Sequence, residues 1–328
     1  MRRWVGALAV VLVAASARAD TAGDGFLHRM ATAIRARLDA AIAARKPKLV
    51  PPVPIEVKWR PQRIAGSIAL GQVVAIVAAD LDGDRRAELY AVTPREVIAL
   101  AIAGGRAHEL GRVAFGGELA VPAPRDVVGA AVADGGAIVA SVSTRARSVR
   151  VRWQGKQLVA EPGEPGFPAC GGERVELAPG RNYFSDGSFG TRCRDDLVDA
   201  TGRHLRVRGV VATNDKLDVA IETCDQAGTC TRAARHELAG VGAAFELADV
   251  DRDGRVEAIV SGAGAPGDPD VVRVMTLGED DKKPMYRHEF HGGVVGVVSA
   301  DVDGDGRPCV IVAVRLAGAN RVDLWRLN

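Results

Sequence analysis

Aromatic residues are scarce in this sequence, and neither sign of charge dominates it. Phe, Trp and Tyr together make up 4% of the chain, so a core must be filled by small and β-branched side chains, which pack well in layered β-sheets. The 43 basic and 41 acidic residues leave a formal net charge of only +2. Because this balance lacks a basic excess, we expect no nucleic-acid partner.

Linear signatures of the common active sites are also missing. The sequence contains no Gly-x-Ser-x-Gly elbow, no Cys-x-x-Cys or His-x-x-x-His pair, and no glycine-rich phosphate loop that opens a helix. His288 and His291 are one residue too close for the zinc-protease motif, and on a strand they would point to opposite faces. No single motif therefore predicts an enzyme.

The longest apolar run is at the start of the chain. Arg2 and Arg3 precede an apolar stretch at residues 4–15, and a triplet of mostly small residues follows at 17–19. This order is typical of a secretory signal peptide, and the stretch is shorter than the ~20 residues that a membrane-spanning helix needs. We expect residues 1–19 to be a signal peptide that is cleaved near Ala19 and Asp20. The mature chain would then be secreted or periplasmic, without a transmembrane segment.

Residues 20–54 are expected to form an amphipathic helix and a proline-rich linker. Apolar residues from Phe26 to Ile42 recur at helical spacing, with arginines on the remaining faces. The prolines within 51–54 end this pattern and force an extended backbone. The helix either packs against the rim of the following domain or docks on a partner or a membrane surface.

Three later segments share a pattern of strand, acidic loop and strand. They lie at Val73–Val92, Phe245–Val260 and Val294–Val314. Weaker echoes at Val132–Ser141 and Val210–Ile221 have lost most of the acids, so five units are visible. Units that cannot each bury their own faces predict a closed ring or a solenoid, and four short strands per unit favour the ring.

The sequence thus predicts an all-β fold, a β-propeller of four-stranded blades over residues 55–328, preceded by the short helix. A glycine-rich, loop-rich insertion is expected at about 160–200, and it could hide further units.

The three loops carry carboxylates at regular positions. In the first acidic loop (residues 80–88) and the second (249–257), acids occupy positions one, three, five and nine. So many carboxylates in one small volume repel one another unless a hard cation lies among them, and a set of oxygen ligands favours Ca²⁺. Gly254 and Gly306, at position six of the second and third loops, allow a sharp bend around an ion.

An EF-hand is the rival interpretation of these loops, because it shares the first three acids and the glycine. It also requires a bidentate acid at position twelve between two helices. Position twelve is Ala91, Val260 or Val312 in the three loops, and the flanks are rich in β-branched residues. These residues argue against an EF-hand.

With an acid at position nine that leads directly into a strand, the loops resemble the calcium-binding turns of FG-GAP or VCBS repeat proteins, the integrin-α type of β-propeller. The resemblance covers the three loops and their flanking strands. It implies one four-stranded blade per repeat, usually in a seven-bladed ring, and a role in adhesion, recognition or scaffolding. Because units shorter than the 52-residue spacing of the second and third loops would fit in the chain, we expect six or seven blades. Carried over by position, the implied Ca²⁺ ligands are Asp80, Asp82, Asp84, Arg86 through its carbonyl, Glu88, Asp249, Asp251, Asp253, Arg255 through its carbonyl, Glu257, Asp301, Asp303 and Asp305.

Two residues depart from the family's pattern. Arg85 stands in the first loop where glycine is usual at position six, so a looser turn is expected there. Cys309 replaces the acid at position nine of the third loop (301–309), which removes a strong ligand. The third loop is therefore the weakest of the three candidates.

Five cysteines fit an exported protein, in which disulfides persist. Cys224 and Cys230 enclose a turn sequence between two strand-like runs, which favours a disulfide across a hairpin. Cys170 and Cys193 lie in the same glycine-rich insertion and are the next most plausible pair, which leaves Cys309 unpaired.

The sequence therefore favours an exported calcium-binding module that recognises a protein or glycan ligand, rather than an enzyme. The alternative is a propeller-fold hydrolase or lyase, whose catalytic groups would converge on the central channel from separate blades and escape a motif search. Residues in the insertion, expected on exposed loops, are the candidates for that alternative. They are Asp186, Asp195, Asp196 and His204.

Overall fold

The computed structural model divides the chain into two compact units, Met1–Val50 and Pro51–Asn328. It describes residues 34, 35, 37, 55–65, 70–120, 127–169, 172–175, 190–212, 215–225, 228–264, 268–278, 284–316 and 321–328. The expected signal peptide and proline-rich linker lie outside these residues. Of the expected N-terminal helix only residues 34, 35 and 37 are described, and all three are helical. No helix among the described residues is long and apolar enough to cross a membrane.

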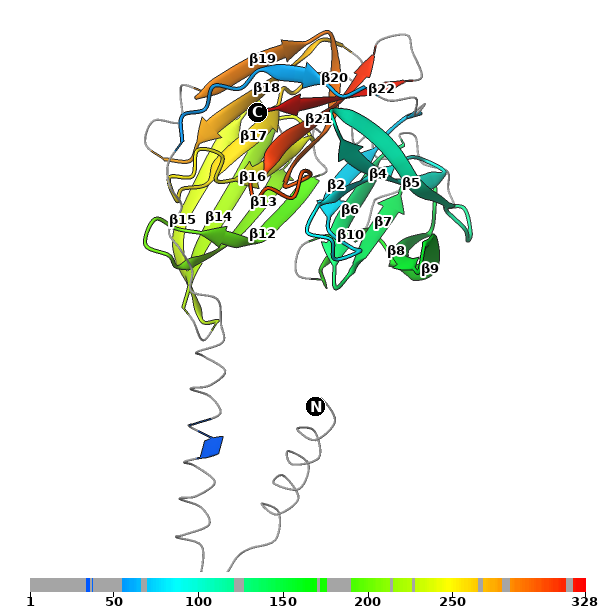
Figure 1. Ribbon diagram of the computed structural model, residues 1–328, viewed down its shortest axis with the longest axis horizontal. Helices are drawn as coiled ribbons and strands as arrows, with labels where there is room; N and C mark the ends of the chain where they lie inside the picture. Colours follow the sequence, from blue (N-terminus) through cyan, green and yellow to red (C-terminus); the bar gives the residue numbers. More distant parts are fainter. Residues whose placement is uncertain are drawn as a thin grey trace, which may run out of the picture. The chain divides into compact units, whose positions relative to one another are not determined.

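The second unit is an all-β propeller of five four-stranded antiparallel sheets that follow one another around a ring (Figure 1). Blade 1 contains β2 (Ala75–Ala79), β3 (Glu88–Val92), β4 (Glu96–Ala103) and β5 (Arg106–Ala114). Blade 2 contains β6 (Gly129–Asp134), β7 (Ala137–Val142), β8 (Arg147–Gln154) and β9 (Gln157–Pro165). Blade 3 contains β12 (Gly190–Val198), β13 (His204–Ala212), β14 (Lys216–Cys224) and β15 (Cys230–Ala239). Blade 4 contains β16 (Phe245–Ala248), β17 (Glu257–Ser261), β18 (Asp270–Thr276) and β19 (Tyr286–Phe290).

Blade 5 is built from both ends of the propeller sequence. Its first three strands are β20 (Gly292–Ala300), β21 (Cys309–Leu316) and β22 (Val322–Leu327), and its fourth is β1 (Pro61–Arg63). β1 pairs with β22 in the register Pro61 to Leu327. A separate two-stranded sheet, β10 (Phe167–Pro168) with β11 (Arg174–Val175), contacts β6 and β7 of blade 2.

Four clusters of buried apolar side chains pack successive blades together, and each lies between two neighbouring sheets. Small and branched side chains fill all four, as the low aromatic content predicts. Each cluster contains residues from both of its blades. Examples are Ile311 and Ile76 for blades 5 and 1, Tyr90 and Ile138 for blades 1 and 2, Val207 and Leu247 for blades 3 and 4, and Val312 and Ile259 for blades 4 and 5. Within the described residues, no such cluster joins blade 2 to blade 3.

The fifth interface is polar because blade 3 has one apolar and one charged face. On β13, the residues from His204 to Val211 alternate between exposed or half-buried and buried. The buried set faces blade 4, and Arg206 and Arg208 belong to the other set. Across the sheet, Arg206 aligns with Glu222 and then Arg232. A charged face cannot form an apolar interface, so blades 2 and 3 are left separated by a cleft.

The all-β propeller of four-stranded blades is confirmed, but its blade number is corrected. Six or seven blades were expected, whereas the described residues form five. No additional blade is found in the described part of the expected insertion; β9, β10, β11 and β12 occupy it instead. The echo at Val132–Ser141 is the first hairpin of blade 2, and the echo at Val210–Ile221 is the second hairpin of blade 3.

The disulfide between Cys224 and Cys230 is confirmed, and it closes the β14–β15 hairpin. Cys193 is also disulfide-bonded, and its predicted partner Cys170 lies outside the described residues. Cys309 is a buried free thiol.

Candidate functional site

The three acidic loops fold alike. Each connects the first strand of a blade to the second, in blades 1, 4 and 5. In each loop the first aspartate accepts a hydrogen bond from the backbone N–H five positions later, so that the carboxylate lies inside the turn. These bonds run from Arg85 to Asp80, from Gly254 to Asp249 and from Gly306 to Asp301, at 3.0, 3.0 and 2.7 Å.

Positions four and six of every loop have a left-handed backbone, which non-glycine residues rarely adopt. The residues with positive φ are Gly83, Arg85, Arg252, Gly254, Gly304 and Gly306. Arg85 therefore adopts the glycine conformation, with φ of 74°. The looser turn expected there is absent, because the hydrogen bond to Asp80 is retained.

The second loop has the most buried carboxylates. Oxygens of Asp249, Asp251 and Glu257 lie within 4.8 Å of one another. Glu257 is 1% exposed; its Oε2 accepts the N–H of Val250, whereas its Oε1 has no hydrogen-bond partner. Asp249 Oδ1 is also buried without a partner. Buried polar atoms are costly when unsatisfied, and a cation among these oxygens would satisfy both.

The pKa shifts in the second loop also favour a cation site. Burial raises the pKa of Glu257 to about 9 and that of Asp249 to about 6, and neighbouring carboxylates add to both shifts. A bound cation would reverse these shifts, because it favours the charged form of each acid. Asp253 is not one of the three clustered acids and is ion-paired with Arg255.

The first loop also gathers its predicted acids. Carboxylate oxygens of Asp80, Asp82, Asp84 and Glu88 lie within 4.8 Å of one another. The three aspartates are exposed and Glu88 is buried. Glu88 Oε2 accepts hydrogen bonds from the Leu81 N–H and from a buried tyrosine hydroxyl, each at 3.1 Å. Both clusters have the oxygen-only chemistry of a site for a hard cation.

The third loop pairs with an arginine side chain. The guanidinium of Arg326 on β22 lies 2.5 Å from Asp303 Oδ2. Burial raises the pKa of Cys309 to about 11, so the thiol at position nine is neutral at physiological pH. The predicted ligands Asp301, Asp303 and Asp305 retain the shape of the loop, but an arginine side chain supplies the positive charge.

The loops also contact one another from blade to blade. The Arg252 guanidinium of the second loop donates to the Gly306 carbonyl of the third, and the Ala87 N–H of the first donates to the Asp301 carbonyl. At Gly254, an added Cβ would lie 2.1 Å from the backbone nitrogen of Ala200 in the β12–β13 turn of blade 3. The turns are therefore packed into one continuous arc.

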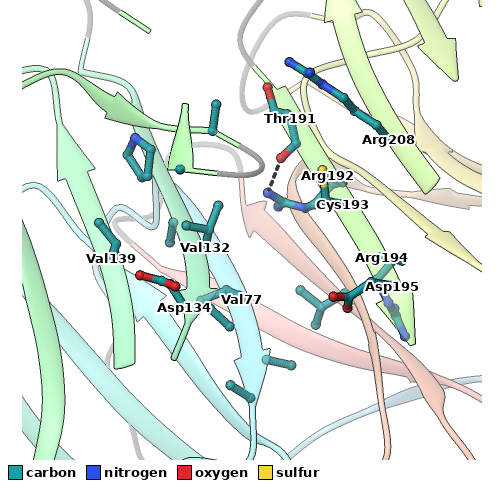
Figure 2. Close-up of a pocket in the computed structure, with 18 of the residues that line it drawn as sticks. Val77, Val132, Asp134, Val139, Thr191, Arg192, Cys193, Arg194, Asp195 and Arg208 are labelled. Atoms are coloured by element: carbon teal, nitrogen blue, oxygen red, sulfur yellow. Dashed lines mark hydrogen bonds between the residues drawn. The ribbon is translucent and has the colours of Figure 1, made fainter. Parts of the chain in front are cut away.

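A cleft of about 1700 Å³ lies between blades 2 and 3 and reaches the innermost strands. Figure 2 shows Arg192, Arg194 and Arg208 on its blade 3 side, opposite Val132 and Asp134 of blade 2. Ala87 and Asp301 of the acidic loops also line it. The cleft therefore opens beside the candidate metal loops.

Two of these arginines bridge the innermost strands. Arg194 is bound to Asp196 at 2.6 Å, lies 3.7 Å from the buried Glu246, and donates to the Ser299 carbonyl of blade 5. Arg192 lies 4.0 Å from Glu246. Burial raises the pKa of Glu246 even though both guanidinium groups oppose the shift. This cluster ties blades 3, 4 and 5 together at the channel.

The residues singled out for the enzyme alternative are not brought together. Asp195 and Asp196 lie on β12, and His204 begins β13, where it aligns with Val198 and Cys224. The expectation that they occupy exposed loops was therefore wrong for these three. Asp186 lies outside the described residues.

Sequence reasoning missed three features of these sites: Arg326, the central arginines, and the turn at Asp199. Asp199 accepts hydrogen bonds from Thr201 and Arg203, and the Arg203 side chain pairs with it at 2.8 Å. The Thr-Gly-Arg that follows Ala200, similar to the Asp-Gly-Arg of the second loop, is the signal that could have revealed it.

No protein-family model and no curated protein matches the chain. The fold and the two acidic clusters that could hold a metal ion thus carry the functional argument.

Proposed function

We propose that the protein is an exported, calcium-binding β-propeller of the FG-GAP or VCBS type that acts as a recognition, adhesion or scaffold module. In this proposal Ca²⁺ occupies the first and second acidic loops, and the third loop uses Arg326 in place of an ion. The observation that carries the proposal is the pair of buried oxygens without partners, Asp249 Oδ1 and Glu257 Oε1.

Calcium suits these loops better than other common metals do. The ligand atoms are carboxylate oxygens, without a histidine or thiolate in either cluster. Calcium accepts six to eight oxygens in irregular geometry, so backbone carbonyls such as those expected from Arg86 and Arg255 could complete the shell. The ion would neutralise the cluster and hold the first two strands of its blade together.

Export is supported by the disulfide chemistry, because disulfides persist in oxidising compartments. The signal peptide is inferred from sequence alone.

A recognition role is favoured over the alternative of a hydrolase or lyase by the residues near the axis. The mouth of the channel opposite the acidic loops is a cavity of about 200 Å³, lined in its described part mostly by Ala, Gly and Val. Among the charged residues near the axis, Arg192, Arg194 and Glu246 are held by one another and by backbone carbonyls. Asp270, at the mouth, accepts hydrogen bonds from the backbone N–H groups of Gly262, Val271 and Val294. Such groups hold strands together, whereas a catalytic acid or base must be free to exchange a proton.

Thermal unfolding with and without Ca²⁺ tests the calcium proposal. An ion that binds only the folded state at 100 times its Kd adds about 2.7 kcal/mol of stability. For a domain of this size we expect calcium to raise the Tm by roughly 5–10 °C relative to chelator. An identical Tm in calcium and in chelator would overturn the proposal.

Matched substitutions at position three separate the loops. Asp251→Asn in the second loop should remove a large part of the calcium-dependent shift in Tm. Asp303→Asn in the third loop should lower the Tm equally with and without calcium, because its partner is Arg326. A calcium shift that depends on Asp303 and is insensitive to Asp251 would contradict the assignment of the loops.

A further inference from the structure

The cleft between blades 2 and 3 is the one interblade boundary without an apolar cluster among the described residues. Its volume of about 1700 Å³ exceeds the roughly 300–1,000 Å³ of pockets that hold small molecules. The cleft thus has room for a segment of polymer, and its chemistry indicates which polymer.

Charge is divided between the two walls. The blade 3 wall carries five arginines against three acids, and the wall made by blade 2 with β10 and β11 carries three arginines against four acids. The blade 3 arginines are Arg192, Arg194, Arg206, Arg208 and Arg232. With Glu246 and Asp301 included, the whole lining carries eight arginines and nine acids, so the basic excess is confined to the blade 3 wall. This wall favours a ligand with negative charge.

The outer part of the blade 3 wall has the most available arginines. Arg194 is fully engaged at the channel, as described above. By contrast, Arg206 lies 3.9 Å from Glu222 and its side chain is 58% exposed. Arg232 is exposed and has no ion pair to any described carboxylate. Arg208 pairs with Glu173, and its side chain is 44% exposed. These three groups can reach a ligand from solvent.

The spacing of the arginines fits an extended polypeptide. Arg206 and Arg208 are two residues apart on β13 and point to the same side of the sheet, so they repeat at about 6.8 Å. Acidic side chains at alternate positions of an extended peptide repeat at the same distance, and guanidinium groups bind carboxylates in bidentate geometry.

The described lining contains no aromatic side chain. Single-stranded nucleic acids are bound largely by stacking on aromatic rings, so this wall is not built for them. Its recognition groups are guanidinium donors and short aliphatic side chains. This composition favours a peptide whose carboxylates alternate with small residues.

We propose that the cleft between blades 2 and 3 binds an extended acidic segment of a partner protein, with Arg206, Arg208 and Arg232 as its carboxylate-binding residues. This inference rests on the proposed recognition function and names its surface and its ligand chemistry. It does not depend on occupancy of the acidic loops by calcium.

Fluorescence anisotropy with a labelled peptide of alternating Glu and Ala tests the proposal on the full mature chain. The wild-type protein should bind this peptide, should not bind an alternating Lys and Ala peptide of equal length, and should lose affinity as salt rises. The double variant Arg206→Gln, Arg232→Gln should bind at least about tenfold more weakly. Arg208 is left unchanged because its loss would also break the pair with Glu173.

A control double variant, Arg112→Gln, Arg287→Gln, removes two exposed arginines from the outer strands of blades 1 and 4, outside the cleft. It should bind the Glu-Ala peptide like the wild type. Equal loss of affinity in both double variants, or no binding by the wild type, would overturn the cleft assignment. Tighter binding of a labelled oligogalacturonate that depends on Arg206 and Arg232 would overturn the choice of a polypeptide.

The peptide measurement is made both in calcium and in chelator, below the Tm measured in each. Peptide binding without a calcium effect on the Tm would refute the calcium loops and leave the cleft proposal standing. A calcium effect on the Tm without peptide binding would refute the cleft proposal alone.

Discussion

Blades 4, 5 and 1 differ from blades 2 and 3 in how they are joined. Blades 4, 5 and 1 have long acidic loops that contact one another, and apolar clusters fill the boundaries between these blades. Blades 2 and 3 have shorter turns at the equivalent position, residues 135–136 and 199–203, and face each other across the cleft. One arc of the ring is thus packed, and the other leaves a cleft between the charged face of blade 3 and the wall that blade 2 makes with β10 and β11.

The partners of the turn acids also differ around the ring. In blades 2, 3 and 5 an arginine pairs with the turn acid: Arg150 with Asp134, Arg203 with Asp199, and Arg326 with Asp303. Blades 1 and 4 retain clustered carboxylates, although in blade 4 Arg255 also pairs with Asp253, outside the cluster. Carboxylates that lie close together repel one another. A turn can reduce this repulsion by having fewer acids or by pairing an acid with a guanidinium group.

The largest loss of stability is expected at Gly254, where the acidic loops of blades 4, 5 and 1 meet blade 3. Gly254→Ala places a Cβ against the backbone of Ala200 at a positive φ, so we expect a loss of about 3 kcal/mol in the free energy of unfolding. Gly306→Ala is the matched control, because the same loop position there has open space around it. It should cost only about 1 kcal/mol. Denaturant unfolding measures both, and equal costs would show that the contact between the turns is unimportant.

The packed and open boundaries can be compared with a valine on an innermost strand of each. Val297→Ala on β20 removes two methyl groups from a fully buried site, which should cost about 2 kcal/mol. Val132→Ala on β6 alters the half-buried wall of the cleft, which should cost less than about 1 kcal/mol. A cost at Val132 as large as that at Val297 would mean that blades 2 and 3 are packed in solution.

The smallest change in stability is expected at Arg85, whose positive φ strains the backbone of the first acidic loop. Arg85→Gly should stabilise the protein by about 1 kcal/mol, because glycine adopts the φ of 74° more easily than arginine does. Arg86→Gly, next in the chain and outside the positive-φ set, should be neutral or destabilising because it makes the unfolded chain more flexible. The same unfolding curves decide the matter, and a destabilised Arg85→Gly variant would contradict the proposed strain.

The repeated acidic loops made the propeller predictable, because each loop marks the first hairpin of a blade. The pattern failed where the acids are lost. Blade 3 has only Asp199 in its first turn, so the sequence echo was placed one hairpin later, at Val210–Ile221. Its first strand, β12, carries Arg192, Arg194 and Asp196, and this charged sequence resembles a loop. β12 is charged because its side chains line the channel and the cleft.

The acidic clusters could be predicted because their ligands are adjacent in the sequence. The ion pair between Arg326 and Asp303 could not be predicted. It depends on the pairing of β22 with β21 and on the fold of the loop between β20 and β21. The cleft was equally hidden, because alternation on β13 shows a charged face but does not reveal which blade lies opposite.

Strand β1 has a consequence for biosynthesis. Residues 61–63 leave the ribosome long before residues 322–327, the strand to which they bind. Until then β1 has no neighbour within its blade, and exposed strand edges promote aggregation. Pairing over almost the whole length of the propeller is also a slow kind of folding step. The nascent chain therefore carries β1 without its partner until the strand at residues 322–327 has been translated.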